Sequence, residues 1–496
     1  MLAGLVFPYA FAPVAAASLV YLALGLLFWT WLDASPWQAA LRGFLFGLGQ
    51  FSLGVYWIHV CLHDYARATE LAAFLISAAC VIFLAGFPAL AGLLAGFYRH
   101  KSVAVKLLLV FPAIWVLCEW LRAWLEFPGF PWLQIGYSQI DGIPGALAPI
   151  LGVYGIGHFV AFSVGAALYW FRPEPKQLLR LAFRLGLLFG TVLLLDRIQW
   201  TSPAGDPLRV ALLQGNIEQQ IKWKPEAKEK TIRWYFETTL SHLGVDLIVW
   251  PETSIPVSYH RIADPLQELG QRAVGKGSDL LVGIPLYDPA TRKVYNSLVL
   301  LGATEGRYLK RHLVPFGEYF PFQPLSVQIA QYMDFQMLGF LPGPRSQAPL
   351  NAAGIRLAPS ICYEDVFGQE MLDHMPQALL LVNSTNDAWF GQSIALEQNL
   401  QMARMRSRET GRFLIRAANT GLSAIIAPDG KVAKLAPPFT AAVLSGQVQP
   451  MSGRTPYMAY GDYLILGLLG VTLLFIASPL RFANSVSNEY PSENTE

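Results

Sequence analysis

Charged side chains are scarce in this sequence: Lys, Arg, Asp and Glu make up 14% of its 496 residues, whereas 54% are hydrophobic. A soluble globular domain carries roughly 25% charged residues, so a chain of soluble domains alone is excluded. Much of this chain is therefore expected to lie in lipid. The formal net charge is only +2, which gives no sign of a nucleic-acid partner, and none is expected.

Cysteine is also rare, with four residues in the chain. Cys61, Cys80 and Cys118 fall in or near apolar stretches, which leaves Cys362 alone in the more polar region after residue 200. Outside the cytoplasm, a thiol without a disulfide partner needs another reason to be present, and catalysis is one. The eight histidines have no metal-ligand spacing and no phosphate-binding glycine motif appears, so we expect no metal and no other cofactor.

Long apolar stretches divide the first 200 residues into candidate membrane spans, since about 20 apolar residues cross a bilayer. The chain begins without a basic region ahead of its apolar residues, so a cleaved signal peptide is not expected. Pro8 and Pro13 interrupt the first segment, and the sequence leaves open whether it spans. We count seven segments before residue 200 and one after residue 460, about eight in all. They lie near residues 1–13, 14–32, 43–62, 71–98, 106–125, 146–171, 180–196 and 463–479.

Two basic loops set the expected orientation. Residues 98–106 and 171–184 hold clusters of Lys and Arg, and such clusters face the cytoplasm. The span at 185–196 then carries the following region to the other side of the membrane, and Arg481 returns to the cytoplasm. The predicted organisation is a transmembrane bundle over 1–200, an extracytoplasmic catalytic domain over 201–460, a final transmembrane helix over 461–480 and a cytoplasmic tail over 481–496.

Beyond residue 200, short apolar strands alternate with helices, which indicates an α/β domain. Each predicted strand is a run of apolar residues closed by Gly, Pro, Asn or Asp. The strands are expected within 208–217, 245–254, 278–287, 294–302, 354–364, 378–386 and 421–431. Helices are expected over 225–243, 264–274 and 395–411.

In layered α/β folds, functional groups collect at the ends of strands. Three strand ends or adjoining loops of this region carry reactive side chains. They are Glu252 in "WPETS", Lys310 in "YLKRHLVPFGEYFP" and Cys362 in "SICYED". Taken singly, Cys362 also suits a small buried side chain, Glu252 a helix cap and Lys310 a solvated basic surface. Together they supply a nucleophile, a general base and a cation for an oxyanion.

In this chain order, Glu252, Lys310 and Cys362 resemble the Glu–Lys–Cys triad of the nitrilase superfamily. The resemblance implies a four-layer α-β-β-α sandwich, with Glu318 in "PFGEY" as the auxiliary acid that positions Lys310 or the base. Glu364 follows the nucleophile by two residues and is expected to orient the nucleophile turn or Lys310. A role at the surface is the alternative for Glu364.

Motifs in the predicted membrane part make this resemblance more specific. "FPGFPWLQIGYSQID" (127–141), "GVYGIG" (152–157) and "VALLQGNI" with the following "KW" (210–223) resemble the bacterial apolipoprotein N-acyltransferase family, over about residues 40–480. The resemblance implies transfer of a fatty acyl chain from a phospholipid, expected to be phosphatidylethanolamine, through a thioester on Cys362. The acceptor would be the N-terminal amine of S-diacylglyceryl-cysteine in an apolipoprotein. It also implies the bacterial inner membrane with a periplasmic catalytic domain, and a monomer is expected.

Both implied substrates are lipids, so the site is expected to open to the bilayer. Segment 324–344 is apolar and nearly uncharged; we interpret it as a lid in the outer leaflet, with an ordinary buried loop or helix as the alternative. Trp57, Trp132 and Tyr137 are interpreted more simply as an interfacial aromatic belt. Candidate substrate-binding or gating residues are Trp132, Trp223, Tyr363, Trp389 and Phe390.

Two other functions compete with this interpretation. A membrane-tethered amidase or nitrilase would use the same triad on another amide or acyl substrate, although segment 324–344 argues against a small soluble one. A transporter with an accessory outer domain would carry ionisable residues inside its spans, where Glu119 and Arg122 are the borderline cases. The sequence does not indicate the acyl-chain preference or which lipoproteins are served.

Overall fold

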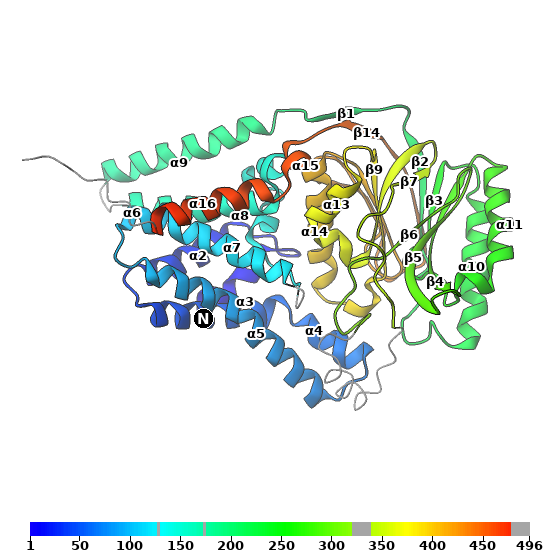
Figure 1. The fold of residues 1–496 in the computed structure, drawn as a ribbon, viewed down its shortest axis with the longest axis horizontal. Coiled ribbons are helices and arrows are strands. Elements are labelled where there is room, and N and C mark those ends of the chain that lie inside the picture. The colour runs from blue at the N-terminus through cyan, green and yellow to red at the C-terminus, as the bar shows by residue number, and fades with distance from the viewer. Residues whose placement is uncertain (126–128, 172–174, 320–338, 478–496) are drawn as a thin grey trace, which may run out of the picture.

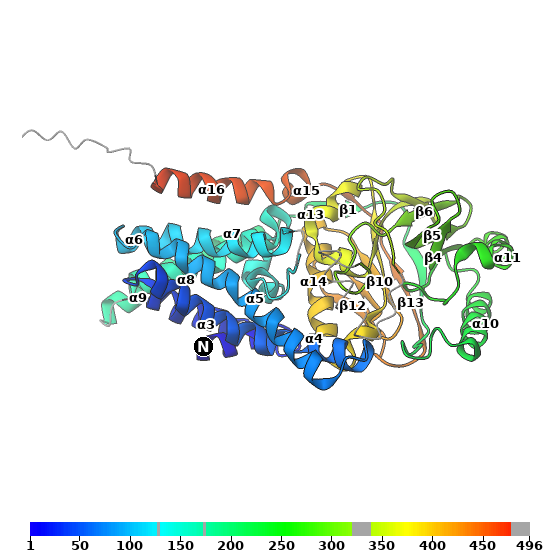
Figure 2. The ribbon, with the colours of Figure 1, turned by 60° about the horizontal axis from the view of Figure 1, so that its bottom comes forward.

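The computed structural model describes residues 1–125, 129–171, 175–319 and 339–477. Helices from both ends of the chain form one part of the molecule, and two β-sheets with flanking helices form the other (Figure 1). Helix α14 (Ala395–Thr410) lies between the sheets and the helical part, and α16 (Tyr463–Ala477) returns along the other helices (Figure 2).

Three helical stretches are long and apolar enough to cross a membrane: Glu70–Phe97, Val103–Trp124 and Ile143–Trp170. Pro36–Gly54 and Trp57–Tyr65, bent by 50°, add a fourth if the pair is one span. The predicted number of about eight spans is therefore not confirmed by length and composition. The candidate spans and the other apolar helices of this part are α2 (Ser18–Trp31), α3 (Pro36–Gly54), α4 (Trp57–Val60), η2 (Cys61–Tyr65), α5 (Glu70–Phe97), α6 (Val103–Val105), η3 (Lys106–Val110), α7 (Phe111–Trp124), η5 (Ile143–Leu147), α8 (Ala148–Trp170), α9 (Pro175–Leu195) and α16.

Small residues allow α3 and α5 to approach closely. A Cβ atom on Gly43 would lie 2.1 Å from the backbone oxygen of Pro88, and one on Gly92 would lie 2.2 Å from that of Ala39. Such close backbone contacts are typical of helix pairs in membranes, where lipid is as apolar as the helix surface.

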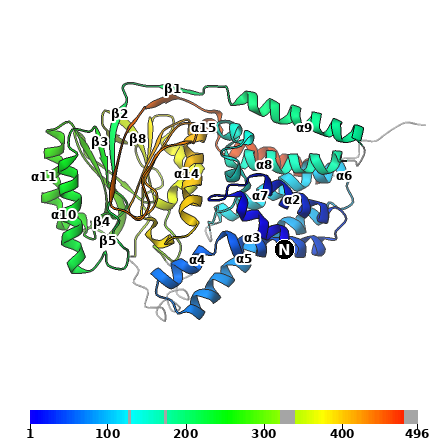
Figure 3. The ribbon, with the colours of Figure 1, turned by 180° about the vertical axis from the view of Figure 1, so that it is seen from behind.

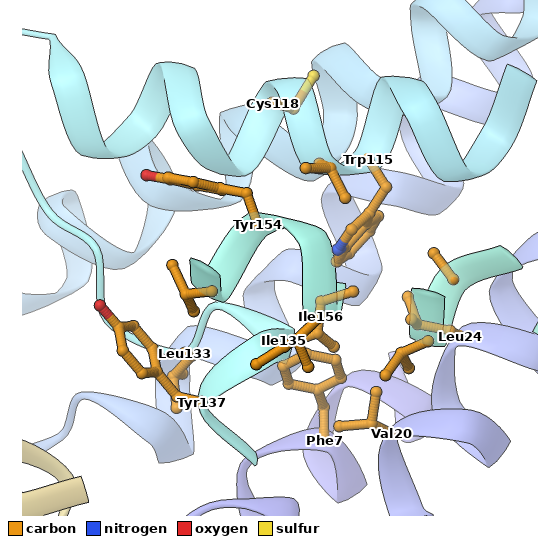
Figure 4. Close-up of a cluster of buried hydrophobic side chains, with 14 of the residues drawn as sticks. Phe7, Val20, Leu24, Trp115, Cys118, Leu133, Ile135, Tyr137, Tyr154 and Ile156 are labelled. Atoms are coloured by element: carbon orange, nitrogen blue, oxygen red, sulfur yellow. The ribbon is translucent and has the colours of Figure 1, made fainter. Parts of the chain in front are cut away.

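The core of the helical part is assembled from stretches far apart in the sequence (Figure 4). Side chains from η1 (Phe7–Ala10), α2, α7, η4 (Ile135–Gln139) and α8 meet there. Close packing of this kind fixes how the helices sit relative to one another. The labelled members include Phe7, Val20, Leu24, Trp115, Ile135, Tyr154 and Ile156.

Two six-stranded sheets stack face to face in the other part. Their strand orders are β13-β2-β3-β4-β5-β6 and β12-β11-β10-β9-β8-β7. The runs β2-β3-β4 and β8-β9-β10 are parallel, and the outer strands are antiparallel. The bounds are β2 (Leu208–Gln214), β3 (Leu247–Val249), β4 (Asp279–Asp288), β5 (Lys293–Leu301), β6 (Gly306–Leu309), β7 (Leu350–Ala352), β8 (Ile355–Ile361), β9 (Leu380–Thr385), β10 (Leu414–Ala418), β11 (Ala424–Ile426), β12 (Val432–Leu435) and β13 (Ala442–Val448). A separate pair joins β1 (Thr201–Pro203) to β14 (Met451–Gly453).

Helices cover the outer face of each sheet and complete four layers. Leu212 and Val249 of one sheet pack between the sheets against Leu357 and Val382 of the other. Helices α10 (Pro225–Ser241) and α11 (Ala263–Val274) cover the first sheet, and α14 with α13 (Gly368–Met371) covers the second (Figures 1 and 3). The predicted α-β-β-α sandwich is confirmed.

Helix α14 joins the two parts because it is buried on both sides. Ala403 packs towards the second sheet, whereas Met405 packs among the helices. Near its end, Glu409 accepts a hydrogen bond at 3.0 Å from the backbone N–H of Val153 in α8. Gly152 interrupts α8 there, with φ +64° and ψ −168°, so the Glu409 carboxylate binds at the N-terminus of the second segment of α8.

We predict that Gly152→Ala destabilises the protein. The position has a positive φ, and the added Cβ would lie 2.3 Å from the ring of Tyr457. Strain and displacement together should lower the free energy of unfolding by about 1–3 kcal/mol, measured by thermal unfolding in detergent. Gly190→Ala in α9 is the control, because a Cβ there meets nothing within 4 Å. An equal effect at both positions would contradict the explanation.

Candidate active site

Cys362 lies at a sharp turn immediately after β8. It is the first residue of η7 (Cys362–Val366) and adopts φ +52°, a region that residues other than glycine rarely occupy. Its backbone oxygen accepts a hydrogen bond from the Asn383 Nδ2 at 3.3 Å. Strained backbone of this kind clusters at functional sites.

The other two residues of the predicted triad form an ion pair close to this thiol. The Lys310 Nζ lies 3.1 Å from the Glu252 Oε1 and 2.8 Å from the Glu318 Oε2. Glu252 follows β3 and Lys310 follows β6. Charges on Glu252 and Lys310 both act on the thiol of Cys362. The structure thus brings together Glu252, Lys310, Glu318 and Cys362 from three separate stretches of chain.

Two asparagines that the sequence did not point to hold the base in place. The Asn296 Nδ2 on β5 donates to the Glu252 Oε1 at 2.6 Å and to the Glu318 Oε1 at 3.0 Å. The backbone N–H of Asn386 donates to the Glu252 Oε2 at 2.9 Å. Both oxygens of Glu252 therefore have donors, and Asn296 ties the two carboxylates to one geometry.

The electrostatics favour a charged lysine and a neutral thiol. Burial alone would lower the pKa of Lys310, but the carboxylates of Glu252 and Glu318 overcome it and raise that pKa well above its usual value. Burial and the charge of Glu252 raise the pKa of Cys362, and Lys310 offsets only part of this rise. A thiol that does not ionise beforehand needs a base to take its proton during attack.

Glu364 is buried, so the alternative of a surface role is wrong. Its carboxylate accepts hydrogen bonds from the backbone N–H groups of Ile361 (2.7 Å), Arg311 (2.7 Å) and His312 (3.2 Å). It also accepts one from the Tyr308 hydroxyl at 3.1 Å. Since Ile361 precedes Cys362 and Arg311 follows Lys310, one side chain fixes the turn of the nucleophile relative to the lysine.

A buried arginine that was also not predicted supports the nucleophile turn, η7 (Cys362–Val366). The Arg416 Nη1 on β10 donates to the Asp365 Oδ2 at 2.7 Å and the Asn383 Oδ1 at 2.8 Å. Its Nη2 donates to both carboxylate oxygens of Asp387 at 3.0 Å. Asp365 belongs to η7 and Asn383 holds the backbone of Cys362, so Arg416 links the turn to β9 and β10.

Three of the predicted gating residues form one aromatic cluster beside the nucleophile. Tyr363 stacks on Trp132 with ring centroids 5.9 Å apart, and Phe390 meets Trp132 edge to face at 6.4 Å. The Tyr363 hydroxyl donates to the backbone oxygen of Gly129 at 2.5 Å. These contacts join the nucleophile turn to the helical part.

The other aromatic residues singled out from the sequence lie elsewhere than predicted. Trp223 is 42% exposed and stands apart from this cluster, whereas Trp389 contacts the ring of Tyr65 in η2. Trp57, Trp132 and Tyr137 are all buried, so the prediction of an interfacial belt is wrong: they pack against neighbouring side chains instead of meeting lipid headgroups. Most of the expected lid, 324–338, lies outside the described residues.

Within the described ranges, no group of three or more His, Cys, Asp or Glu side chains is arranged to hold a metal ion. The absence of a metal stays a prediction.

The comparisons with known proteins agree with this arrangement. Residues 209–457 match the family model described as carbon-nitrogen hydrolase, and together with the Glu–Lys–Cys cluster this defines a carbon–nitrogen hydrolase domain joined to a helical part. Residues 3–166 match the model of the apolipoprotein N-acyltransferase N-terminal domain. The chain belongs to the apolipoprotein N-acyltransferase family.

Full-length relatives support this assignment. An apolipoprotein N-acyltransferase from Methylococcus capsulatus is 46% identical over 489 residues, covering 97% of this chain and 96% of the relative. One from Coxiella burnetii is 39% identical over 478 residues, covering 96% and 98%. Among solved structures, a nitrilase-superfamily member from Saccharomyces cerevisiae matches 51% of this chain and 93% of its own, with 16% identity and a TM-score of 0.37.

We predict that the thiol of Cys362 stays protonated in the resting protein. Because its pKa is raised above the ordinary thiol value of about 8.5, less than about a quarter should be ionised at pH 8. The difference in absorbance at 240 nm between wild type and Cys362→Ala measures the thiolate. A full thiolate signal at pH 7 would contradict a base-assisted attack.

We predict that Arg416→Met destabilises the protein by about 3–5 kcal/mol, because it leaves the carboxylates of Asp365 and Asp387 buried without their cation. Denaturant unfolding in detergent measures the loss. Arg209→Met is the matched control, since Arg209 pairs with Asp246 at the surface, where an ion pair contributes little. Similar unfolding midpoints for the two variants would rule out the supporting role of Arg416.

Proposed function

We propose that this chain transfers a fatty acyl chain from a phospholipid to the N-terminal amine of S-diacylglyceryl-cysteine in apolipoproteins. The acyl chain passes through a thioester on Cys362. The protein works as a monomer in the bacterial inner membrane, with about eight spans and its catalytic domain on the periplasmic side. Phosphatidylethanolamine is the expected donor.

The observation that carries the proposal is the place of the nucleophile turn. Cys362 faces the ion pair of Glu252 and Lys310, while the next residue, Tyr363, is bonded to Gly129 and stacked on Trp132 in the helical part. The reacting sulfur thus lies at the junction between the catalytic sandwich and the apolar helices. A lipid ester held among those helices has a short path to it.

In the first half-reaction the thiol attacks the ester carbonyl of the donor. Glu252 takes the thiol proton as the carbon–sulfur bond forms, and the ammonium of Lys310 stabilises the negative charge that develops on the carbonyl oxygen. When the carbon–oxygen bond of the ester breaks, Glu252 returns the proton to the departing alkoxide. The products are a lysophospholipid and a thioester on Cys362.

In the second half-reaction the neutral amine of the acceptor attacks the thioester. Glu252 takes a proton from the amine as the carbon–nitrogen bond forms, and Lys310 again stabilises the oxyanion. The carbon–sulfur bond then breaks and the sulfur recovers its proton from Glu252. A thioester is a more reactive acyl donor than an amide, so amide formation proceeds without ATP.

A membrane-tethered amidase would use the same residues with water in place of the lipid amine. The full-length relatives named apolipoprotein N-acyltransferases do not favour it. Release of ammonia from small amides would be its signature, whereas transfer gives a lipoprotein whose third acyl chain resists hydroxylamine.

We predict that incubation with phosphatidylethanolamine alone adds one acyl chain to the protein, detected by intact mass and removed by hydroxylamine. Glu252→Gln and Lys310→Met should slow this acylation at least about a hundredfold, since each removes a group that acts in the transition state. Cys362→Ala should gain no acyl chain.

The matched control is Glu229→Gln, because Glu229 is exposed on α10 and pairs with Arg233 at the surface. It should acylate at the wild-type rate. Normal acylation of Cys362→Ala would show that another residue is the nucleophile and would refute the proposal.

A further inference from the structure

The segment between β2 and α10 connects the catalytic base to the helical part. The Gln219 Oε1 accepts a hydrogen bond at 3.0 Å from the side chain of Asn386, whose backbone N–H holds Glu252. The neighbouring Gln220 donates at 3.0 Å to the backbone oxygen of Asp64 in η2. This segment, 217–223, therefore reaches from the edge of the active site to the helices in which lipid would be held.

Lys222 on this segment is a buried cation for which the described residues provide no acceptor. In the described part of the chain, the other buried lysines and arginines all donate hydrogen bonds to carboxylate or carbonyl oxygens. The Lys222 side chain is 1% exposed, and within the same ranges its ammonium has neither a hydrogen-bond acceptor nor an ion-pair partner. The other six are Lys106, Arg122, Lys310, Arg406, Arg412 and Arg416.

An unpartnered buried charge is costly unless something else compensates it. Burial lowers the pKa of Lys222 to about 8, and the negative charge of Glu252 opposes part of that fall. At neutral pH the side chain is still mostly an ammonium ion. Lys310 is equally buried, at 1% exposed, and the charge of Glu252 acts on both lysines.

We propose that Lys222 binds the phosphodiester of the donor lipid. The inference rests on the proposed function and specifies which part of the donor is recognised. The phosphodiester is an anion, separated from the ester carbonyl by no more than the short glycerol backbone. Lys310 is the cation assigned to the oxyanion of the reaction, and the reacting amine of the acceptor is neutral, so it offers no negative charge for a second cation to bind. An ammonium near the base, on a segment tied to the helices, therefore suits the phosphate.

The test compares two acyl donors that differ only in the phosphate headgroup. Dipalmitoyl phosphatidylethanolamine and dipalmitoylglycerol are offered in mixed micelles, and acylation of Cys362 is followed by intact mass. The wild type should favour the phospholipid by about 10–100-fold in kcat/KM, the range expected for one charge-assisted hydrogen bond. In Lys222→Met the ratio should fall to near one, mostly through a higher KM for the phospholipid, and Lys222→Arg should recover part of it.

Lys224→Met is the matched control, because Lys224 is an exposed lysine two residues away; its donor ratio should equal that of the wild type. Lys222→Met should unfold at the same temperature as the wild type or higher, since it removes an uncompensated buried charge. An equal loss with both donors would show that Lys222 acts through Glu252 and would overturn the proposal, as would a preserved ratio. If the wild type accepts neither donor, the proposed function fails instead.

Discussion

The ion pairs of one buried lysine organise the active site. Lys310 lies between the carboxylates of Glu252 and Glu318, and it cannot be moved without leaving two buried charges uncompensated. Burial keeps the thiol of Cys362 neutral by raising its pKa, and the negative charge of Glu252 adds to that rise. Ionising the sulfur without a base would add a further negative charge, so in the proposed reaction proton transfer to Glu252 accompanies attack.

The contacts between the two parts of the molecule fix the orientation of the sandwich relative to the helical part. Helix α14 is buried against both the second sheet and the helices, and Glu409 fixes its end to the break in α8. The nucleophile turn is bonded to the same helical part through Tyr363. The sandwich therefore presents its α14 layer to the helices and its α10–α11 layer away from them (Figure 2).

Alternating apolar strands and helices predicted an α/β domain, and reactive residues at strand ends pointed to Glu252, Lys310 and Cys362, because both are local signals; the four layers and the triad roles came from the resemblance to the nitrilase superfamily. The sequence did not predict β10 or Arg416, since "FLIRAAN" (413–419) reads as an apolar run with one stray charge. The partners of that charge, Asp365 and Asp387, are 51 and 29 residues away in the sequence. Asn296 was missed for the same reason: only the folded sheet places it between Glu252 and Glu318. The belt prediction failed because an aromatic residue near a span has the same local pattern whether it meets lipid or packs inward.

A transferase differs from a hydrolase with the same triad in that it must keep water from hydrolysing the acyl-enzyme. A thioester that waits for a second lipid survives only if water does not reach it with Glu252 free to act as base. Around the nucleophile, Tyr363 and Trp132 are buried and stacked, and Phe390 packs against them. These rings occupy the side of the turn that contacts the helical part. Apolar surroundings of this kind also strengthen the attraction between Lys310 and the oxyanion, so the feature that protects the intermediate also promotes its formation.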